Sequence, residues 1–256
     1  MNLTNPSNLR QRATGRLRSG LACCLIGAVL AGCAVSTAPS GVNDPLEPFN
    51  RKVHAFNTKV DQEILRPLST STKGNGKVSK HIGNFASNLG KPADIVNNVL
   101  QLRLVKASEN LLRFGVNTVF GLGGVFDVAT AAGMPENDTD FGETLHIWGA
   151  AEGAYLELPL MGPTTERDLA GTLIDMVIDP LNTLPRRDRM WASAAKVAER
   201  IGDRGQYSDL LDSVLYESAD SYAQTRLLYL QSRRHELGQT AGEDDFVDPY
   251  EDPYAE

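Results

Sequence analysis

Three ionisable residues lie close enough along the chain to suggest an acid–base group: Asp140, Glu143 and His146. Carboxylates and an imidazole are the common proton donors and acceptors of enzymes, but they must converge on one reacting atom. Glu143 and His146 would share a face only within a helix, and the neighbouring Gly142 weakens the case for one. The favoured interpretation is a loop of polar residues without a catalytic role.

The common catalytic and nucleotide-binding motifs are absent from the sequence. There is no G-x-S-x-G nucleophile elbow and no P-loop. The glycine cluster of residues 121–124 does not complete a dinucleotide fingerprint, because Phe126 stands at the place of the third glycine. The four histidines are scattered, without the spacing of a metal site. The sequence therefore predicts a protein that is not an enzyme and uses no metal or cofactor.

Arg167 is a candidate for binding a phosphate head group, because it stands at a predicted helix start. An arginine beside the amide groups of a helix N-terminus is a common anion site. Thr165 and Asp168, however, have the spacing of a capping box, so a local ion pair and helix cap is the alternative interpretation.

Cys33 carries the most specific chemistry in the sequence. A segment with four arginines precedes an apolar stretch, residues 21–31, which is far shorter than the roughly 20 residues that span a bilayer. Together they have the pattern of a secretory signal. Leu30-Ala31-Gly32-Cys33 resembles a lipobox, in which the cysteine takes a diacylglycerol and the chain is cut just before it. We therefore predict a lipoprotein signal peptide over residues 1–32 and a lipidated tether over 33–42.

The composition limits what the mature chain can bind and how it is stabilised. The other two cysteines, Cys23 and Cys24, lie in the predicted signal peptide, so burial rather than disulfides must stabilise the fold. The formal charge of -7 becomes -11 when the four arginines of residues 1–32 are lost. Seven of the last fourteen residues, 243–256, are acidic, and we predict a disordered acidic tail over 238–256. Without a basic field, nucleic acid is not an expected partner.

Helices must position these residues, because apolar residues recur every three or four positions along most of the chain. The first predicted helix has an apolar face over residues 49–64 and ends at Arg66-Pro67. A polar loop is expected over residues 69–79. The next helix has its apolar face at residues 78–89, and Pro92 is expected to start a new segment.

The second half of the chain also predicts mostly helices. Residues 141–160 are the least regular part and are expected to hold one or two short extended pieces. Because strands with alternating polarity are almost missing, the chain is predicted to be mainly α. The further helices are expected at residues 104–112, from about 165 to before Pro180, at 191–201 and at 208–237.

Residues 114–135 form an apolar segment with Asp127 as its one charge, and they include the glycine cluster. A single spanning helix fits the length, but the glycines should break it near its centre. We predict two short apolar helices joined at the glycines. The sequence leaves open whether this hairpin is buried in an ordinary core or faces lipid.

A set of ordered motifs behind the lipobox resembles the MlaA/VacJ lipoproteins of Gram-negative outer membranes. The resemblance extends from about Asn43 to His235, and it predicts one helical domain over residues 43–237. The motifs that carry it are Asn43-Asp44-Pro45-Leu46-Glu47-Pro48-Phe49-Asn50-Arg51, Asn84-Phe85, Asn88-Leu89, Pro92, Asn97, Leu100-Gln101, Arg113-Phe114, Asn117-Thr118, Gly121, Gly123-Gly124, Asp127-Val128-Ala129, Phe141-Gly142, Thr144-Leu145, Trp148-Gly149, Tyr155, Leu158-Pro159, Gly162-Pro163 and Arg167-Asp168.

This resemblance implies a mainly α fold: a ring-shaped bundle of amphipathic helices embedded in the outer membrane, with a central channel. It implies a lipid-anchored, periplasm-accessible protein that removes mislocalised phospholipids from the outer leaflet. The lipid would pass to a periplasmic lipid-carrier protein that feeds an inner-membrane ABC transporter, and a trimeric porin would be a further partner. The implied channel or gate residues are Asn84, Phe85, Gly121, Gly123, Gly124 and Asp127.

Two other functions stay open at this point. A structural envelope lipoprotein would brace porins without moving lipid. A periplasmic phospholipid hydrolase would act on the same lipids, but the missing nucleophile motif disfavours it.

Overall fold

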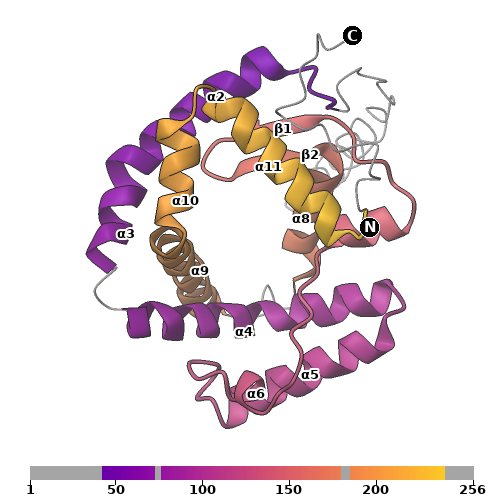
Figure 1. Ribbon diagram of the computed structural model, residues 1–256. Helices are drawn as coiled ribbons and strands as arrows, with labels where there is room; N and C mark the ends of the chain where they lie inside the picture. Colours follow the sequence, from indigo (N-terminus) through magenta and orange to yellow (C-terminus); the bar gives the residue numbers. More distant parts are fainter. Residues whose placement is uncertain (1–41, 73–75, 180–184, 240–256) are drawn as a thin grey trace, which may run out of the picture.

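The computed structural model describes residues 42–72, 76–179 and 185–239 (Figure 1). The predicted signal peptide, Cys33 and the acidic residues 243–256 lie outside this part. The described chain is mainly α-helical, as predicted, with one two-stranded antiparallel hairpin. Its elements, of which η1 and η4 are π-helical turns, are α2 (Glu47–Val60), η1 (Asp61–Leu65), α3 (Arg66–Thr72), α4 (Gly76–Leu100), α5 (Leu104–Val119), α6 (Val128–Ala131), α7 (Phe141–Ile147), β1 (Tyr155–Leu158), β2 (Gly162–Thr165), α8 (Glu166–Ile178), α9 (Arg186–Gln206), α10 (Ser208–Asp212), η4 (Ser213–Glu217) and α11 (Ser221–Glu236).

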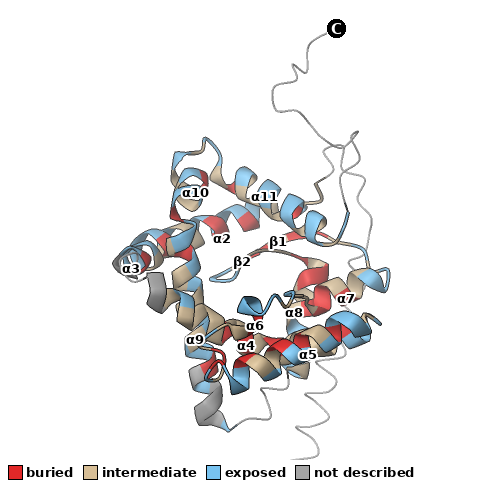
Figure 2. Cartoon of the chain, turned by 60° about the horizontal axis from the view of Figure 1, so that its bottom comes forward, coloured by how far each residue is buried: buried red, intermediate tan, exposed pale blue. Residues whose placement is uncertain are grey.

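The elements are arranged as a ring-like bundle. Figures 1 and 2 both show α2, α9, α4, α8 and α11 following one another around a common centre, with the β1–β2 hairpin beside α11. α5 lies against the side of α4 that faces away from the centre (Figure 1). This arrangement confirms the predicted mainly α, ring-shaped bundle of helices. Within the described ranges, no helix combines the length and the apolar composition that crossing a bilayer requires.

α5 is buried on its polar side and exposed on its apolar side. Its buried residues are Ala107, Asn110, Arg113 and Asn117, which share one helical face. A helix of a water-soluble protein has the opposite orientation. The large apolar side chains that α5 exposes are Leu104, Val105, Leu111, Leu112 and Val119, each by more than half.

The same inversion extends over the described part of the molecule, and Figure 2 shows the distribution of buried and exposed residues. Nineteen polar or charged residues are buried against eleven hydrophobic ones, whereas 29 large hydrophobic residues are exposed. Monomers in water rarely expose extended apolar surface. The exterior of the described chain therefore carries many large apolar side chains, while much of its interior is polar.

Two asparagines of α2 take the place of a neighbouring strand along β1. The side chain of Asn50 donates to the carbonyl of Tyr155 (3.1 Å) and accepts from the amide of Glu157 (3.1 Å). Asn57, two turns later, makes an equivalent pair of bonds further along the chain, at 3.0 and 2.8 Å. Because the backbone groups of an edge strand need partners, these side chains fix α2 on the hairpin.

The predicted helix breaks at two prolines are wrong. The first helix continues past Arg66-Pro67, and residues 69–72 and 76–79 are helical rather than a loop. At η1 the amide of Arg66 bonds to the carbonyl of Asp61, and this wider turn relieves the clash between a proline and the preceding turn. Pro92 lies inside α4, where the packing of α5 and α9 offsets its cost of about 3 kcal/mol.

Two other predictions need correction. Residues 141–160 begin with a regular helix, α7, before the predicted extended piece, β1. A Cβ on Gly171 would lie 2.3 Å from the amide nitrogen of Gly142, so these glycines let α7 and α8 approach closely.

The last predicted helix, 208–237, is interrupted between η4 and α11, where Asp220 caps α11 by accepting from the amide of Ala223.

Candidate functional site

A polar cavity of about 160 Å³ lies between α4, α5 and α9. It forms because α4 and α5 pack along each other with polar stripes face to face, while α9 covers a third side. Its lining residues are Gly83, Asn84, Ser87, Asn88, Lys91, Arg113, Asn117, Asp127, Glu136 and Glu199.

Lys91 is buried among three carboxylates at one end of the polar cavity. Its ammonium nitrogen lies 3.2 Å from Asp94 and 2.9 Å from Glu136, and it also contacts Asp138. Burial acts to lower the pKa of Lys91, but the carboxylates outweigh this effect and raise that pKa. One ammonium balances only one negative charge, and burial therefore raises the pKa of Asp94 to about 7.

Arg113 and Asp127 form another wall of the polar cavity. Arg113 donates to the carbonyl of Met134 (2.7 Å) and lies 3.3 Å from both carboxylate oxygens of Asp127. Asn117 also donates to Asp127, at 3.1 Å. Burial acts to raise the pKa of Asp127, but hydrogen bonds from Thr130 and Asn117 outweigh it, so the pKa is lowered. Asp127 is thus a charged anchor that caps α6.

The turn after α5, residues 120–126, lies on α4 and brings the predicted gate residues together. Asn84 donates to the carbonyl of Val125 (3.3 Å), and Asn88 donates to that of Gly123 (3.1 Å). His81 contacts the Val125 carbonyl as well, at 3.1 Å. The turn is therefore held to α4 by side-chain bonds to its backbone.

Glycines permit this close approach. A Cβ at Gly124, where φ is +100°, would lie 2.3 Å from the Cβ of Asn88. A Cβ at Gly121 would lie 2.1 Å from the carbonyl oxygen of Phe126. At Gly123 a Cβ would meet only the ring of Phe85, at an ordinary 3.9 Å. Packing therefore requires glycine at positions 121 and 124.

The tip of this turn is apolar and exposed. Phe120 is 72% and Leu122 71% exposed, and α6 is a single helical turn. Of the two interpretations of residues 114–135, a hairpin buried in an ordinary core is therefore wrong. Of the two short helices predicted within residues 114–135, the second corresponds to α6. It is shorter than expected, because the glycine turn takes up much of its length.

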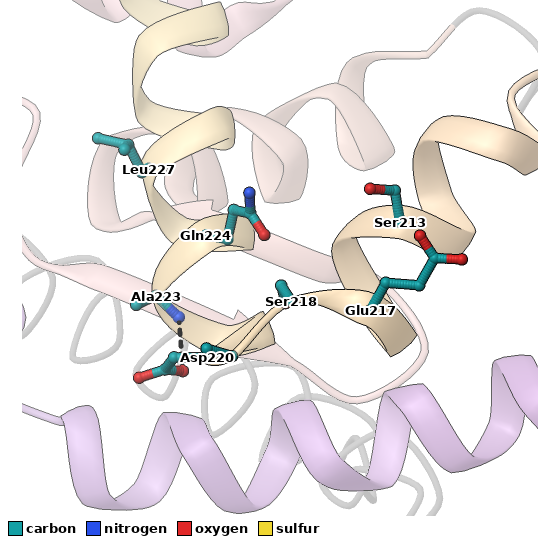
Figure 3. Close-up of a pocket in the computed structure, with 8 residues that line it drawn as sticks. Ser213, Glu217, Ser218, Asp220, Ala223, Gln224 and Leu227 are labelled. Atoms are coloured by element: carbon teal, nitrogen blue, oxygen red, sulfur yellow. Dashed lines mark hydrogen bonds between the residues drawn. The ribbon is translucent and has the colours of Figure 1, made fainter. Parts of the chain in front are cut away.

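Two other hollows differ in character. One of about 250 Å³ lies between the hairpin, α8 and α11 and is amphipathic, with Met161 and Leu169 beside Tyr229 and Arg233. An open hollow of about 550 Å³ lies between η4 and α11, with Leu227 as its one large apolar lining residue. Figure 3 shows the residues that line it. Among the described residues, no group of three or more histidines and carboxylates is arranged to hold a metal.

Comparison with known proteins decides the family. The model of the MlaA lipoprotein family matches residues 42–236. The intermembrane phospholipid transport system lipoprotein MlaA of Escherichia coli (strain K12) is 35% identical over 237 residues, 89% of this chain and 90% of that protein. An uncharacterized protein of Rickettsia felis is 38% identical over 188 residues, 72% of this chain and 74% of that protein. The chain belongs to the MlaA lipoprotein family.

A solved structure supports the same assignment. It comes from work on the "Structural basis for maintenance of bacterial outer membrane lipid asymmetry", is 35% identical in sequence and superposes with a TM-score of 0.66. The match covers 76% of this chain and 98% of the solved one. The ring-like fold is therefore shared with a protein of clear sequence similarity.

Arg167, the head-group candidate of this MlaA family member, is only 4% exposed. Its Nε lies 3.3 Å from Asp168, and Thr165 caps α8 by accepting from the Asp168 amide at 3.2 Å. Arg167 lines none of the three hollows described above. Its surroundings are those of the local ion pair and helix cap that the sequence also allowed.

Asp140, Glu143 and His146 do not form an acid–base group. Asp140 caps α7 and binds Arg233 at 2.7 Å, whereas Glu143 contacts Arg103. The carboxylates therefore have separate structural partners.

Sequence reasoning missed one other constellation in this MlaA family member. His54 of α2 is buried, with Nδ1 3.0 Å from Glu157 and Nε2 3.1 Å from the hydroxyl oxygen of Ser221. A serine, a histidine and a carboxylate in this order are the members of a catalytic triad. Because they come from α2, β1 and α11, no spacing along the chain could reveal them.

Proposed function

We propose that this MlaA family member is a lipoprotein of an intermembrane phospholipid transport system. It removes mislocalised phospholipids from the outer leaflet of the outer membrane, without a chemical step. The observation that carries the proposal is the inverted burial, in which polar residues fill the interior and large apolar side chains cover the exterior. Acyl chains would contact that exterior, and head groups would follow the polar interior.

The proposal also covers the lipid anchor of the protein, its channel and its partner proteins. The acyl chains on Cys33 would anchor it, since more than one chain is needed for stable attachment. The ring would lie in the outer membrane with a central channel, gated by Asn84, Phe85 and the glycine turn together with Asp127. A periplasmic lipid-carrier protein would take the lipid to an inner-membrane ABC transporter, and a trimeric porin would hold the ring in place.

Outer-leaflet phospholipid in a deletion strain tests the proposal. Deletion is expected to raise it, and the wild-type gene should restore the normal level. A Cys33→Ala gene should not restore it, because the protein then loses its anchor. An unchanged phospholipid level on deletion, together with altered porin assembly, would instead favour a bracing role.

Acyl hydrolysis is a second candidate, favoured by the Ser221–His54–Glu157 geometry alone. The Ser221 hydroxyl would attack an acyl carbonyl, His54 would carry its proton to the leaving lysophospholipid, and water would then release the fatty acid. The first turn of α11 offers poor oxyanion stabilisation, because the Ala223 amide is bound to Asp220. Lysophospholipid release that is lost in Ser221→Ala would establish this activity, and no release by wild type would dismiss it.

A further inference from the structure

Two residues that line the polar cavity between α4, α5 and α9 each have a buried polar atom without a partner. The side-chain oxygen of Asn88 and Nε of Arg113 are buried and make no hydrogen bond within the described part of the chain. Asn88 is 3% and Arg113 2% exposed, and both line the cavity. A buried donor or acceptor that stays unpaired is unfavourable, so the cavity is suited to a polar guest.

The charges that line the polar cavity are also unbalanced. Lys91 and Arg113 already have carboxylate partners, Glu136 at 2.9 Å and Asp127 at 3.3 Å. Glu199, half-buried on α9, lines the cavity but forms no ion pair or hydrogen bond with another described residue. Burial, and then the nearby Asp203, raise the pKa of the Glu199 carboxyl, and the weaker opposing effects of Lys196 and Lys91 do not cancel this shift. The groups without a partner are thus two hydrogen-bond acceptors, the Asn88 oxygen and the Glu199 carboxylate, and one donor, Nε of Arg113. Glu199 brings the one negative charge among them.

We propose that the polar cavity binds a zwitterionic phospholipid head group of the phosphoethanolamine class, with Glu199 as the counter-ion of its ammonium. This inference rests on the proposed transport function and names its preferred substrate. Asn88 and Arg113 line the same cavity and carry an unpaired acceptor and an unpaired donor, which suit an ammonium and a phosphate. A phosphoglycerol head group brings no cation to Glu199 and adds a negative charge to a site that already has an excess of carboxylates.

The size and position of the polar cavity fit a head group without its acyl chains. A volume of about 160 Å³ has room for several water molecules, and hence for a small polar group. The acyl chains would remain outside, and the glycine turn bound to Asn88 exposes Phe120 and Leu122 there. An amphipathic lipid would thus meet a polar cavity and an apolar surface in one place.

Competition between two lipids tests the assignment. Full-length protein in detergent is incubated with equal amounts of dihexanoyl phosphatidylethanolamine and dihexanoyl phosphatidylglycerol, and the bound lipids are counted by mass spectrometry after gel filtration. Wild type should bind the ethanolamine lipid in excess, and Glu199→Gln should lower that ratio about tenfold through loss of a charge-assisted bond. Glu217→Gln is the matched control, an exposed carboxylate in the hollow of Figure 3, and should keep the wild-type ratio.

Reversing the charge at Glu199 tests whether this residue recognises the lipid head group or only stabilises the fold. Glu199→Lys should reverse the preference toward phosphatidylglycerol, which a folding defect would not do. Free O-phosphoethanolamine should displace the lipid only weakly, because it lacks acyl chains for the apolar surface. Strong binding of the free compound without binding of the lipid would mean a site for soluble amines and would overturn the proposal.

The two proposals fail in different ways. If both Glu199 variants bind normal amounts of lipid with the wild-type ratio, the head-group assignment is wrong while transport stands. If wild type binds neither lipid and deletion leaves outer-leaflet phospholipid unchanged, the transport function itself is wrong.

Discussion

Asp94 is the carboxylate that the single ammonium of Lys91 leaves least well compensated. Its pKa is about 7 in the folded protein against an ordinary 3.8, because burial raises it and Asp138 adds to the effect. The folded state therefore holds a proton that the unfolded chain loses. This contribution to stability is fully present below about pH 4 and is lost as the pH rises through 7.

Replacing Asp94 by Asn removes this titration. Between pH 5 and 8 the free energy of unfolding of wild type should fall by about 1–3 kcal/mol more than that of Asp94→Asn, measured by urea unfolding in detergent. Glu63→Gln, at a side chain that is 63% exposed, should retain the wild-type pH dependence. Equal slopes for wild type and Asp94→Asn would mean that Asp94 ionises normally.

Individual residues of the polar cavity could be predicted from the sequence, but their pairing could not. The family resemblance predicted Asn84 and Asp127 as channel or gate residues, and the structure places both in the lining of the polar cavity. Glu199 drew no attention, because it reaches the cavity only through the packing of α9 on α4. The periodicity of one helix does not specify the helix that covers it.

At the scale of elements, the glycine turn depends on the absence of side chains where it meets α4. Gly124→Ala should lower the free energy of unfolding by about 2 kcal/mol or more, since it adds both left-handed strain and overlap with Asn88. Gly121→Ala should have a similar effect through the carbonyl of Phe126. Thermal unfolding followed by circular dichroism in detergent measures both.

Gly90→Ala is the matched control for these substitutions. Gly90 lies within α4 and has no atom within 4 Å of a Cβ placed there. Alanine should therefore stabilise the helix by about 0.5–1 kcal/mol. If Gly124→Ala were as well tolerated as Gly90→Ala, the turn would not be packed on α4 as described.

Amphipathic spacing predicted α5, α8 and α9, but it could not predict the π-helical turns. These turns depend on contacts between elements: Asp61 of η1 accepts two bonds from Arg204 of α9, at 2.7 and 2.9 Å. Tyr216 of η4 donates to the same carboxylate at 2.7 Å. A local pattern of apolar residues contains no information about such a network, so both helices were predicted as regular.

For the whole molecule, the sequence specified amphipathic helices without specifying which face would point inward. Periodicity is the same for a helix that buries its apolar face and for one that buries its polar face. Here the polar faces meet, because their amides find partners: Asn97 donates to Asp175 at 2.8 Å, and Asn110 donates to the carbonyl of Asn137 at 2.7 Å. The outward direction of the apolar faces came from the family resemblance alone.

An exterior of this kind should contact acyl chains directly, and Trp148 can report that contact. Trp148 follows α7, is 57% exposed, and is fixed edge-on against Phe141 with ring centres 5.6 Å apart. In Trp191→Phe protein it is the one remaining tryptophan of the sequence. Its emission should be quenched in vesicles with brominated acyl chains and not in matched unbrominated vesicles, because tryptophans of membrane proteins lie at the lipid boundary. Equal emission in both vesicles would place this edge of the ring in water and contradict a lipid-facing exterior there.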